Sequence, residues 1–426
     1  MSAAISVIFF AVCLIGVPLA FAFGIAGMFG LWMKGLPIEL LASKMMFAIN
    51  SFPLLAIPFF MLAGELMVRG GVVRVAIAFA NTIVGRVRGG LGQVTIASGL
   101  GLASVSGAAV ADAAALGSAL IKPLGENYGR PFGAALIAAS GNLGPILPPS
   151  TAMIVYATIA GPTLSLPALF IGGILPAFLI AALMSAYVYV AARRRGFPIS
   201  GEPFSIKAIG WSGLRSLPVI ALPVVVIGGI IGGVFTATEG GAIAVVMAAL
   251  LGFFYTRELK LSDVVPALRD AALTTGVVTV IIAFASTVTF IFSIDHLPMD
   301  LRALLQGLTD DPTVFLLLIF AMLVLVGMFM ESTAAYVMLV PIFAPMALTY
   351  GVDPLHFALV FILTLIVGML TPPVGVLLFL MAGITGLKVG EIIREVWPYI
   401  LIEVAVTLAV LFLPGVFLFL PRLAGY

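Results

Sequence analysis

The sequence predicts an all-α polytopic membrane protein with two inverted-topology repeats, each carrying a re-entrant helical hairpin and a broken transmembrane helix. Of the 426 residues, 62% are hydrophobic and 9% are charged, whereas a soluble globular chain has roughly 25% charged residues. Two apolar segments are each interrupted by glycines and a double proline, Gly141-Asn-Leu-Gly-Pro-Ile-Leu-Pro-Pro-Ser150 and Gly368-Met-Leu-Thr-Pro-Pro-Val-Gly375. These two runs lie at corresponding places in the two halves of the chain.

Neither run can continue as an ordinary helix, because each proline removes a backbone donor and the glycines loosen what remains. For one such run alone, a proline-kinked transmembrane helix would explain the sequence equally well. The pattern Gly-x-x-x-Pro-Pro occurs twice, however, from Gly144 to Pro149 and again from Gly368 to Pro373. Paired interrupted helices in corresponding halves indicate the binding site of a transporter.

Composition also excludes several classes of protein. The 20 basic and 18 acidic residues are nearly balanced, which argues against a nucleic-acid partner. The single cysteine, Cys13, excludes an internal disulfide and a cysteine-based metal cluster. The segment before Lys34 has no basic n-region and no clear cleavage site, so we expect a retained membrane helix rather than a signal peptide.

The first repeat is expected over residues 1–192. Its central element is a re-entrant hairpin over 91–121, because the arms 91–103 and 107–121 are each shorter than the roughly 20 residues of a spanning helix. One long spanning helix is the alternative. The other expected elements are spans at 4–31, 47–68 and 168–191, an interfacial helix between 69 and 90, and a broken helix over 132–160.

Residues 193–237 are expected to be a cytoplasmic loop and a linking transmembrane helix, with the second, inverted repeat over 238–426. The second repeat contains a hairpin over 313–347 and a broken helix over 355–386. Pro123, Tyr128 and Gly129 recur at the same relative spacing as Pro345, Tyr350 and Gly351. The linking helix, at about 217–235, would add the crossing that turns the second repeat upside down.

The distribution of basic residues predicts the orientation. If Arg193, Arg194 and Arg195 are cytoplasmic, alternation of the spans puts 16 of the 20 Lys and Arg residues on that side. This is the asymmetry that the positive-inside rule requires. The prediction places the N-terminus in the cytoplasm and the C-terminus in the periplasm. The four exceptions are Lys34, Lys44, Arg302 and Arg422.

The hairpin tips and the broken helices are the candidate cation- and substrate-binding elements. Hydroxyls and freed carbonyls near mid-membrane suit a desolvating sodium ion, and helix N-termini favour a carboxylate. In the first half the candidates are Ser104, Ser106, Gly107, Gly141, Asn142, Pro148, Pro149 and Ser150. In the second half they are Gly327, Glu331, Ser332, Thr333, Gly368, Thr371 and Pro372. The alternative is that these hydroxyls only bond their own helix backbone. Sodium is expected as a coupling ion, and no cofactor is expected.

Four acidic residues are candidates for burial in the membrane, where a charge is expensive and marks function by default. Glu65 can instead reach the interface at the end of its span, and Glu239 suits the N-terminus of a helix. Asp112 lies two turns beyond the first tip and can bond neighbouring backbone. Glu331, in the second tip, is the best candidate for cation binding or proton sensitivity.

Two other classes of protein fit the sequence less well. An intramembrane enzyme would need a nucleophile with a base or a metal site, and Ser106 has no such partner while His296 and His356 lie at loop or helix-end positions. A proton-conducting subunit of an electron-transfer complex would be expected to carry lysines at mid-membrane; none lies there apart from Lys122 at the end of a hairpin. A Walker motif for ATP hydrolysis is absent from the sequence.

Several of these motifs, in fixed order, resemble the large membrane subunit of tripartite ATP-independent periplasmic (TRAP) transporters, the DctM-like family. They are Leu54-Leu-Ala-Ile-Pro-Phe-Phe-Met-Leu-Ala-Gly64, the Ser-x-Ser-Gly tip and the two glycine–proline runs. The resemblance extends over essentially the whole chain. It implies a sodium-coupled, elevator-type importer of carboxylate-bearing solutes, such as C4-dicarboxylates or sialic acid, in a bacterial inner membrane.

The resemblance also implies partners. These are a small four-helix membrane subunit, expected as a separate polypeptide because this chain lacks the additional N-terminal helices of fused members, and a soluble periplasmic binding protein that delivers the substrate. The functional alternative is a stand-alone sodium–dicarboxylate symporter of similar inverted-repeat architecture.

Overall fold

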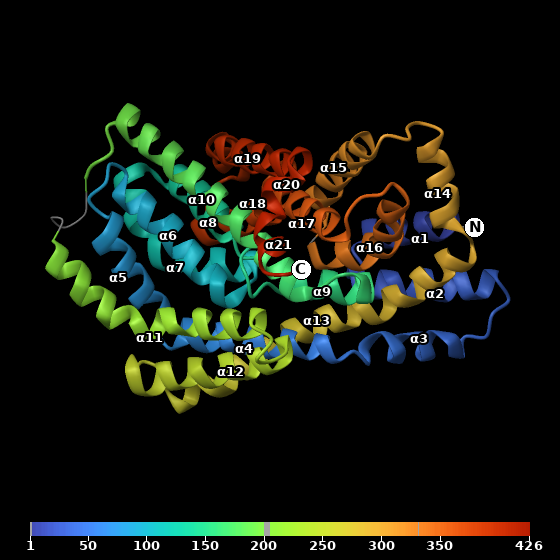
Figure 1. The fold of residues 1–426 in the computed structure, drawn as a ribbon, viewed down its shortest axis with the longest axis horizontal. Helices are drawn as coiled ribbons and strands as arrows, with labels where there is room; N and C mark the ends of the chain where they lie inside the picture. Colours follow the sequence, from blue (N-terminus) through green and yellow to red (C-terminus); the bar gives the residue numbers. More distant parts are fainter. Residues whose placement is uncertain (1, 200–204, 331) are drawn as a thin grey trace.

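Every regular element in the described part of the protein is a helix (Figure 1). The computed structural model describes residues 2–199, 205–330 and 332–426. Within these residues, eight helices are long and apolar enough to cross a membrane. The prediction of an all-α polytopic membrane protein is confirmed.

The first half of the chain runs from a pair of short helices to a long helix that ends in three arginines. Its elements are α1 (Ser2–Leu14), α2 (Leu19–Met33), α3 (Glu39–Ile49), the 3-10 helix η1 (Phe52–Leu55), α4 (Ala56–Arg69), α5 (Val72–Val84), α6 (Gly90–Ser106), α7 (Ala109–Tyr128), α8 (Arg130–Gly141), α9 (Thr151–Ala160), the 3-10 helix η2 (Gly161–Thr163) and α10 (Leu166–Arg195).

The second half repeats this order of elements. They are α11 (Ile206–Ile231), α12 (Ala237–Leu250), the π-helical turn η3 (Leu251–Tyr255), α13 (Leu261–Ile294), α14 (Leu297–Gln306), α15 (Pro312–Phe329), α16 (Ser332–Thr349), α17 (Pro354–Leu370), α18 (Val376–Thr385), α19 (Val389–Phe412), α20 (Pro414–Phe417) and α21 (Phe419–Leu423). Figure 1 places the hairpin α6–α7 toward one end of the long axis and the hairpin α15–α16 toward the other.

Glycine and proline set the turns within these elements. Gly107 adopts φ +62° between α6 and α7, a left-handed conformation that favours glycine. Pro145, Pro148 and Pro149 lie between α8 and α9 and have no N–H to donate to a continuing helix. Gly375, with φ +56°, precedes α18 in the second broken helix. The Pro148–Pro149 bond, like its counterpart in the second half, is cis.

The expectation of a single span over residues 4–31 was wrong. The chain turns at Gly16, which has φ +93°, and α2 begins after Pro18. Helices α1 and α2 then pack side by side, with the rings of Phe9 and Phe23 4.4 Å apart between centroids. A continuous apolar run of this length does not distinguish one long helix from two short ones that fold back on each other.

This hairpin changes the predicted position of the N-terminus. Ser2 donates its backbone N–H to the Asp295 carboxylate at 2.7 Å, and the Lys34 ammonium lies 3.0 Å from the same group. The N-terminus and Lys34 are therefore at one end of the molecule, whereas the sequence analysis placed them on opposite sides. The helix expected as a link over 217–235 corresponds to α11, which begins earlier, at Ile206, and ends earlier, at Ile231. It packs against α12 as α1 packs against α2.

The helices gather into two groups. In the first, α13 lies along α2, α3 and α4, and α4 also packs on α12. These helices run together along the lower side of Figure 1. The second group contains both hairpins and both broken helices, with α19 packed against α8 and α17. The site is built within this second group.

Candidate functional site

The tip of the first hairpin lies directly against the first break. The hydroxyl of Thr151 donates to the carbonyl oxygen of Gly107 at 3.0 Å. A Cβ atom added to Gly107 would lie 2.3 Å from the carbonyl oxygen of Pro149 and 2.8 Å from the Cα of Ser150. The structure thus brings together Gly107, Pro149 and Ser150, which the sequence had placed in one site.

A buried carboxyl group lies behind this tip. Ser106 donates its hydroxyl to one oxygen of Asp112, and the Ala108 N–H donates to the Ser106 hydroxyl at 3.3 Å. Asp112 is 1% exposed, and its other oxygen, Oδ2, is buried without a hydrogen-bond partner among the described residues. A Cβ atom added to Gly144 in the break would lie 2.5 Å from that oxygen. Asp112 therefore presents this oxygen to the break, although the sequence analysis did not include it in the site.

Two of the predicted serines have local bonds. Ser150 accepts from the Met153 N–H at 3.2 Å as the N-cap of α9 and donates to the carbonyl oxygen of Pro145 at 2.6 Å. Ser104 donates to the carbonyl oxygen of Gly101, one turn earlier in α6. Ser104 therefore bonds the backbone of its own helix, as in the alternative, whereas Ser150 joins the backbone of α9 to that of the break.

Asn142 joins the first break to the second half of the chain. Its Nδ2 donates to the carbonyl oxygen of Ile366 at 3.0 Å and to both carboxyl oxygens of Glu403 at 3.1 Å. Its Oδ1 is buried, and no group in the described part of the chain bonds it. Glu403, 1% exposed in α19, was missed by the sequence analysis. Residues 398–420 carry no charged residue apart from Glu403, and this lone acid was the signal that could have found it.

The second tip meets the second break through backbone atoms. A Cβ atom added to Gly327 would lie 3.0 Å from the Cα of Gly368, and the Gly375 N–H donates to the carbonyl oxygen of Met328 at 3.1 Å. Thr371 donates its hydroxyl to Val367 in its own helix at 2.6 Å. The expected approach of tip and break is present, but the Thr371 hydroxyl bonds its own helix.

The remaining second-half candidates are placed as follows. Ser332 is buried at the start of α16, with Thr333 next to it. Pro372 lies in the break, after Thr371, and forms a cis bond to Pro373. Glu331 lies outside the residues that the structure describes.

The other two acids lie at helix ends. Glu65 is 3.3 Å from Arg69, which also pairs with Asp270 at 2.5 Å. Glu239 accepts from the Thr236 N–H at 2.7 Å and forms the capping box of α12. Both positions agree with the interfacial and capping alternatives.

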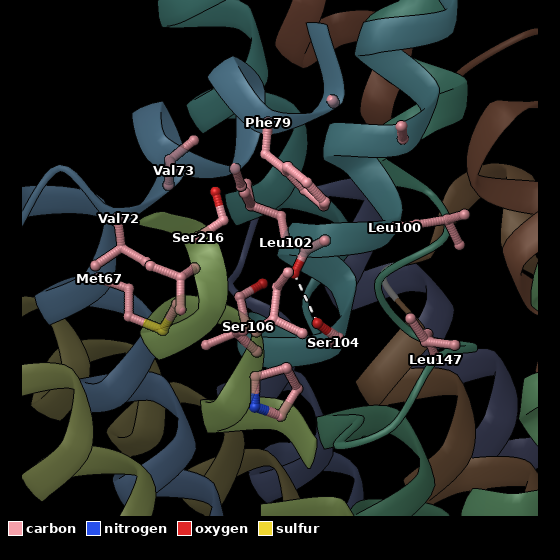
Figure 2. A pocket seen from close by; sticks show the side chains of 18 of the residues that line it. Met67, Val72, Val73, Phe79, Leu100, Leu102, Ser104, Ser106, Leu147 and Ser216 are labelled. Carbon is pink, nitrogen blue, oxygen red and sulfur yellow. Dashed lines mark hydrogen bonds between the residues drawn. The ribbon is translucent and has the colours of Figure 1, made fainter. Parts of the chain in front are cut away.

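An apolar cavity of about 360 Å³ lies beside the first tip (Figure 2). It is lined by α4, α5, α6 and α11, with Phe178 from α10 and Leu147 from the break. Figure 2 shows Ser104 and Ser106 among apolar side chains such as Met67 and Phe79. The tip therefore has open space between itself and the first group of helices.

Two helical hairpins whose tips contact two broken helices are typical of a membrane subunit of a secondary transporter. Residues 6–416 match the family model of the tripartite ATP-independent periplasmic transporter, DctM component. The chain belongs to this family, as a large membrane subunit, and the predicted resemblance is confirmed.

Relatives with known names support this assignment. The chain is 34% identical to the C4-dicarboxylate TRAP transporter large permease protein DctM of Pseudomonas aeruginosa, over 91% of this chain and 90% of the relative. It is 34% identical to the 2,3-diketo-L-gulonate TRAP transporter large permease protein YiaN of Escherichia coli, over 94% of each. It is 35% identical to the isethionate TRAP transporter permease protein DctMQ of Oleidesulfovibrio alaskensis, over 95% of this chain but only 64% of that longer relative.

A solved structure shares the fold. The YdaH transporter of Alcanivorax borkumensis, whose structure has an unusual topology, superposes with a TM-score of 0.66 over 89% of both chains. The sequence identity is 17%. This likeness supports the fold alone.

Proposed function

We propose that this chain imports anionic, carboxylate-bearing solutes across a bacterial inner membrane by sodium symport. The observation that carries the proposal is the pair of buried oxygens at the first break, Asp112 Oδ2 and Asn142 Oδ1, which bond nothing in the described chain. Buried polar atoms almost always have partners, and sodium is bound by oxygen atoms freed from helix at mid-membrane. A cation at the break would give these oxygens the partner that the described residues do not.

The solute is proposed to arrive on a soluble periplasmic binding protein, and a separate small four-helix membrane subunit would complete the transporter. Names of relatives cover C4-dicarboxylate, 2,3-diketo-L-gulonate and sialic acid. One relative is named for isethionate, which is a sulfonate. The shared chemistry is an anionic head group on a small solute.

Proteoliposomes test this proposal. The chain, its small subunit and the binding protein encoded beside it should take up a labelled dicarboxylate, sialic acid or isethionate only with an inward sodium gradient. ATP should have no effect. Full uptake with potassium in place of sodium and a proton gradient alone would contradict sodium coupling, and uptake by the chain alone would favour the stand-alone symporter.

The two helix groups suggest how transport proceeds. We propose that the group with the hairpins and broken helices moves as a unit against a scaffold that includes the surface helices α5 and α14. The small residues of α6 favour close packing at this boundary. A Cβ atom added to Gly101 of α6 would lie 3.9 Å from the Cβ of Ala76 in α5, close to the mean separation of about 3.8 Å in disulfides.

Gly101→Cys with Ala76→Cys, made in a Cys13→Ser background, therefore tests an elevator movement. The oxidised pair should abolish uptake while substrate binding persists, and reduction should restore uptake. Each single cysteine is the matched control and should transport under both conditions. Unimpaired uptake with the crosslink fully formed would contradict the elevator.

A further inference from the structure

The amide of Asn142 makes a polar bond between the two halves of the molecule inside an apolar core. Asn142 follows α8 in the first half, whereas its acceptors, the carbonyl of Ile366 in α17 and the carboxyl of Glu403 in α19, belong to the second half. Asn142 is fully buried and Glu403 is 1% exposed. The bond therefore lies where both broken helices meet α19.

This bond connects equivalent positions of the repeat. The spacing from Asn142 to Ile366 equals the spacing from Gly144 to Gly368, which relates the two Gly-x-x-x-Pro-Pro runs. The prolines inside α10 and α19, at positions 176 and 398, also correspond, and their spacing sets Glu403 opposite Ala181. The polar partners occur once each, and their repeat counterparts are apolar.

Two acceptors fix the orientation of the Asn142 amide. A backbone carbonyl and a carboxyl group of Glu403 both face the side chain, so the NH2 group must point toward them. Oδ1 is left as the buried oxygen without a partner among the residues described. The orientation decides whether a cation at the first break meets an oxygen or an N–H group of Asn142.

We propose that Glu403 is a positioning residue that fixes the Asn142 amide and couples ion binding in the two halves. The inference rests on the proposed sodium symport. Ile366 lies just before Gly368, so a rearrangement of the second break on ion binding shifts the carbonyl that Asn142 holds. Glu403 accepts from the same amide on the α19 side. It therefore keeps the Asn142 side chain oriented toward the Ile366 carbonyl when that carbonyl moves.

Sodium-binding isotherms of the purified full-length chain with its small subunit test this role. The wild-type protein should bind sodium with a Hill coefficient above 1. Glu403→Leu, which leaves a single carbonyl to hold the amide, should lower the coefficient toward 1 and weaken half-saturation by about 5- to 150-fold, the usual range for coupling between sites. Glu403→Gln keeps a carbonyl acceptor for Asn142, so it should retain the wild-type coefficient.

Thr364→Val is the matched control. Thr364 is buried in α17 and donates to Val360 of its own helix, so its loss removes a buried polar group without touching the bond between halves. Thermal unfolding of each variant reports whether the fold is kept. If Glu403→Leu does not fold, two other variants replace it: Asn142→Asp alone, and Asn142→Asp combined with Glu403→Gln. The double variant exchanges the carboxyl and the amide, so its Hill coefficient should be higher than that of Asn142→Asp alone.

The outcomes separate this inference from the proposed function. A wild-type protein that binds no sodium would contradict the symport, whatever Glu403 does. Sodium binding by Glu403→Leu with wild-type steepness and affinity, or an exchanged pair no better than Asn142→Asp, would overturn the coupling role alone. Equal damage from Glu403→Gln and Glu403→Leu would mean that the carboxyl acts by its charge or proton, and this too would overturn a positioning role.

Discussion

Gly327 and Gly368 touch through their backbones, so that a Cβ atom added to Gly368 would lie 2.5 Å from the Cα of Gly327. The first residue is in the second hairpin and the second is in the second broken helix. A contact this close leaves no room for any side chain. Helices α15 and α17 therefore pack backbone against backbone next to the second tip.

Gly368→Ala should lower the thermal unfolding temperature and reduce uptake. The added methyl group meets backbone rather than a flexible side chain, and overpacking of this kind costs about 1–3 kcal/mol. Gly383→Ala, in the adjacent half-helix α18, is the control, because a Cβ atom there would meet nothing within 4 Å among the described residues. Equal stability of the two variants would contradict the close packing of hairpin and break.

Gly107→Ala should block docking of the first tip. The residue has φ +62°, and its Cβ atom would lie 2.3 Å from the carbonyl oxygen of Pro149. Gly129→Ala shares the positive φ, at +88°, but meets no described atom within 4 Å. Sodium-dependent uptake should therefore be lost in the first variant and largely kept in the second, and similar losses in both would assign the effect to backbone strain.

The two serines of the first half should behave differently. Ser150 caps α9, so Ser150→Ala should cost about 0.5–2 kcal/mol of stability, measured by thermal unfolding, and Ser150→Thr should restore it. Ser106 bonds Asp112, and a hydrogen bond to a charged group contributes about 1.5–3 kcal/mol. Ser106→Ala should therefore weaken sodium affinity by roughly 10- to 150-fold. Wild-type sodium dependence in Ser106→Ala would remove this tip from the site.

Labelling of introduced cysteines should place the N-terminus and the α2–α3 loop on one side of the membrane. In a Cys13→Ser background, an impermeant maleimide should reach a cysteine in an N-terminal tag and Glu39→Cys from the same side. It should reach Arg194→Cys from the other. Labelling of the tag together with position 194 would contradict the hairpin of α1 and α2.

The pKa of Asp295 is held below its usual range, first by the hydroxyl of Ser2 and then by Lys34. A lowered pKa means that the bonds of the Asp295 carboxylate to Ser2 and Lys34 contribute their full stability above the ordinary pKa of about 3.9. This stability is lost as the pH falls through the pKa of the folded state. Protection of α1 against hydrogen exchange, corrected for intrinsic rates, should thus stay constant from pH 8 to about 4. Asp295→Asn should reduce this protection, whereas Asp300→Asn on the exposed face of α14 should not.

The broken helices could be predicted because glycine and proline act locally on the backbone. The hairpins were predicted from arms expected to be shorter than a spanning helix, but the arms have 17 residues in α6, 20 in α7 and 18 in each of α15 and α16. The hydropathy and length of an arm therefore do not show that it turns back inside the membrane. The N-terminal hairpin could not be predicted, since Gly16 and Pro18 interrupt an apolar run that also fits one helix, and only the packing of Phe9 on Phe23 decides. Hydropathy indicates that a segment lies in the membrane, but it does not show whether the chain crosses the membrane or turns back.

At the candidate site, the sequence predicted which segments come together better than it predicted which side chains bond one another. Ser104 and Thr371 bond their own helices, because a serine or threonine in a helix always has a backbone carbonyl within reach. Asp112 carries one of the two buried oxygens and Glu403 orients the amide that carries the other, and both roles depend on which distant helix faces them. Such pairings are set by tertiary packing and have no local sequence pattern.

The single bond between Asn142 and Ile366 also bears on how such a chain could have arisen. An ancestral half that dimerised with a second copy of itself, inserted in the opposite orientation, would have set these two positions against each other across the symmetry axis. Two identical copies cannot supply an amide on one side and an isoleucine on the other. The acceptor at position 366 is a backbone carbonyl, which any residue supplies, so only the difference between the two side chains would postdate the divergence of the two copies. From then on neither half could be exchanged for the other.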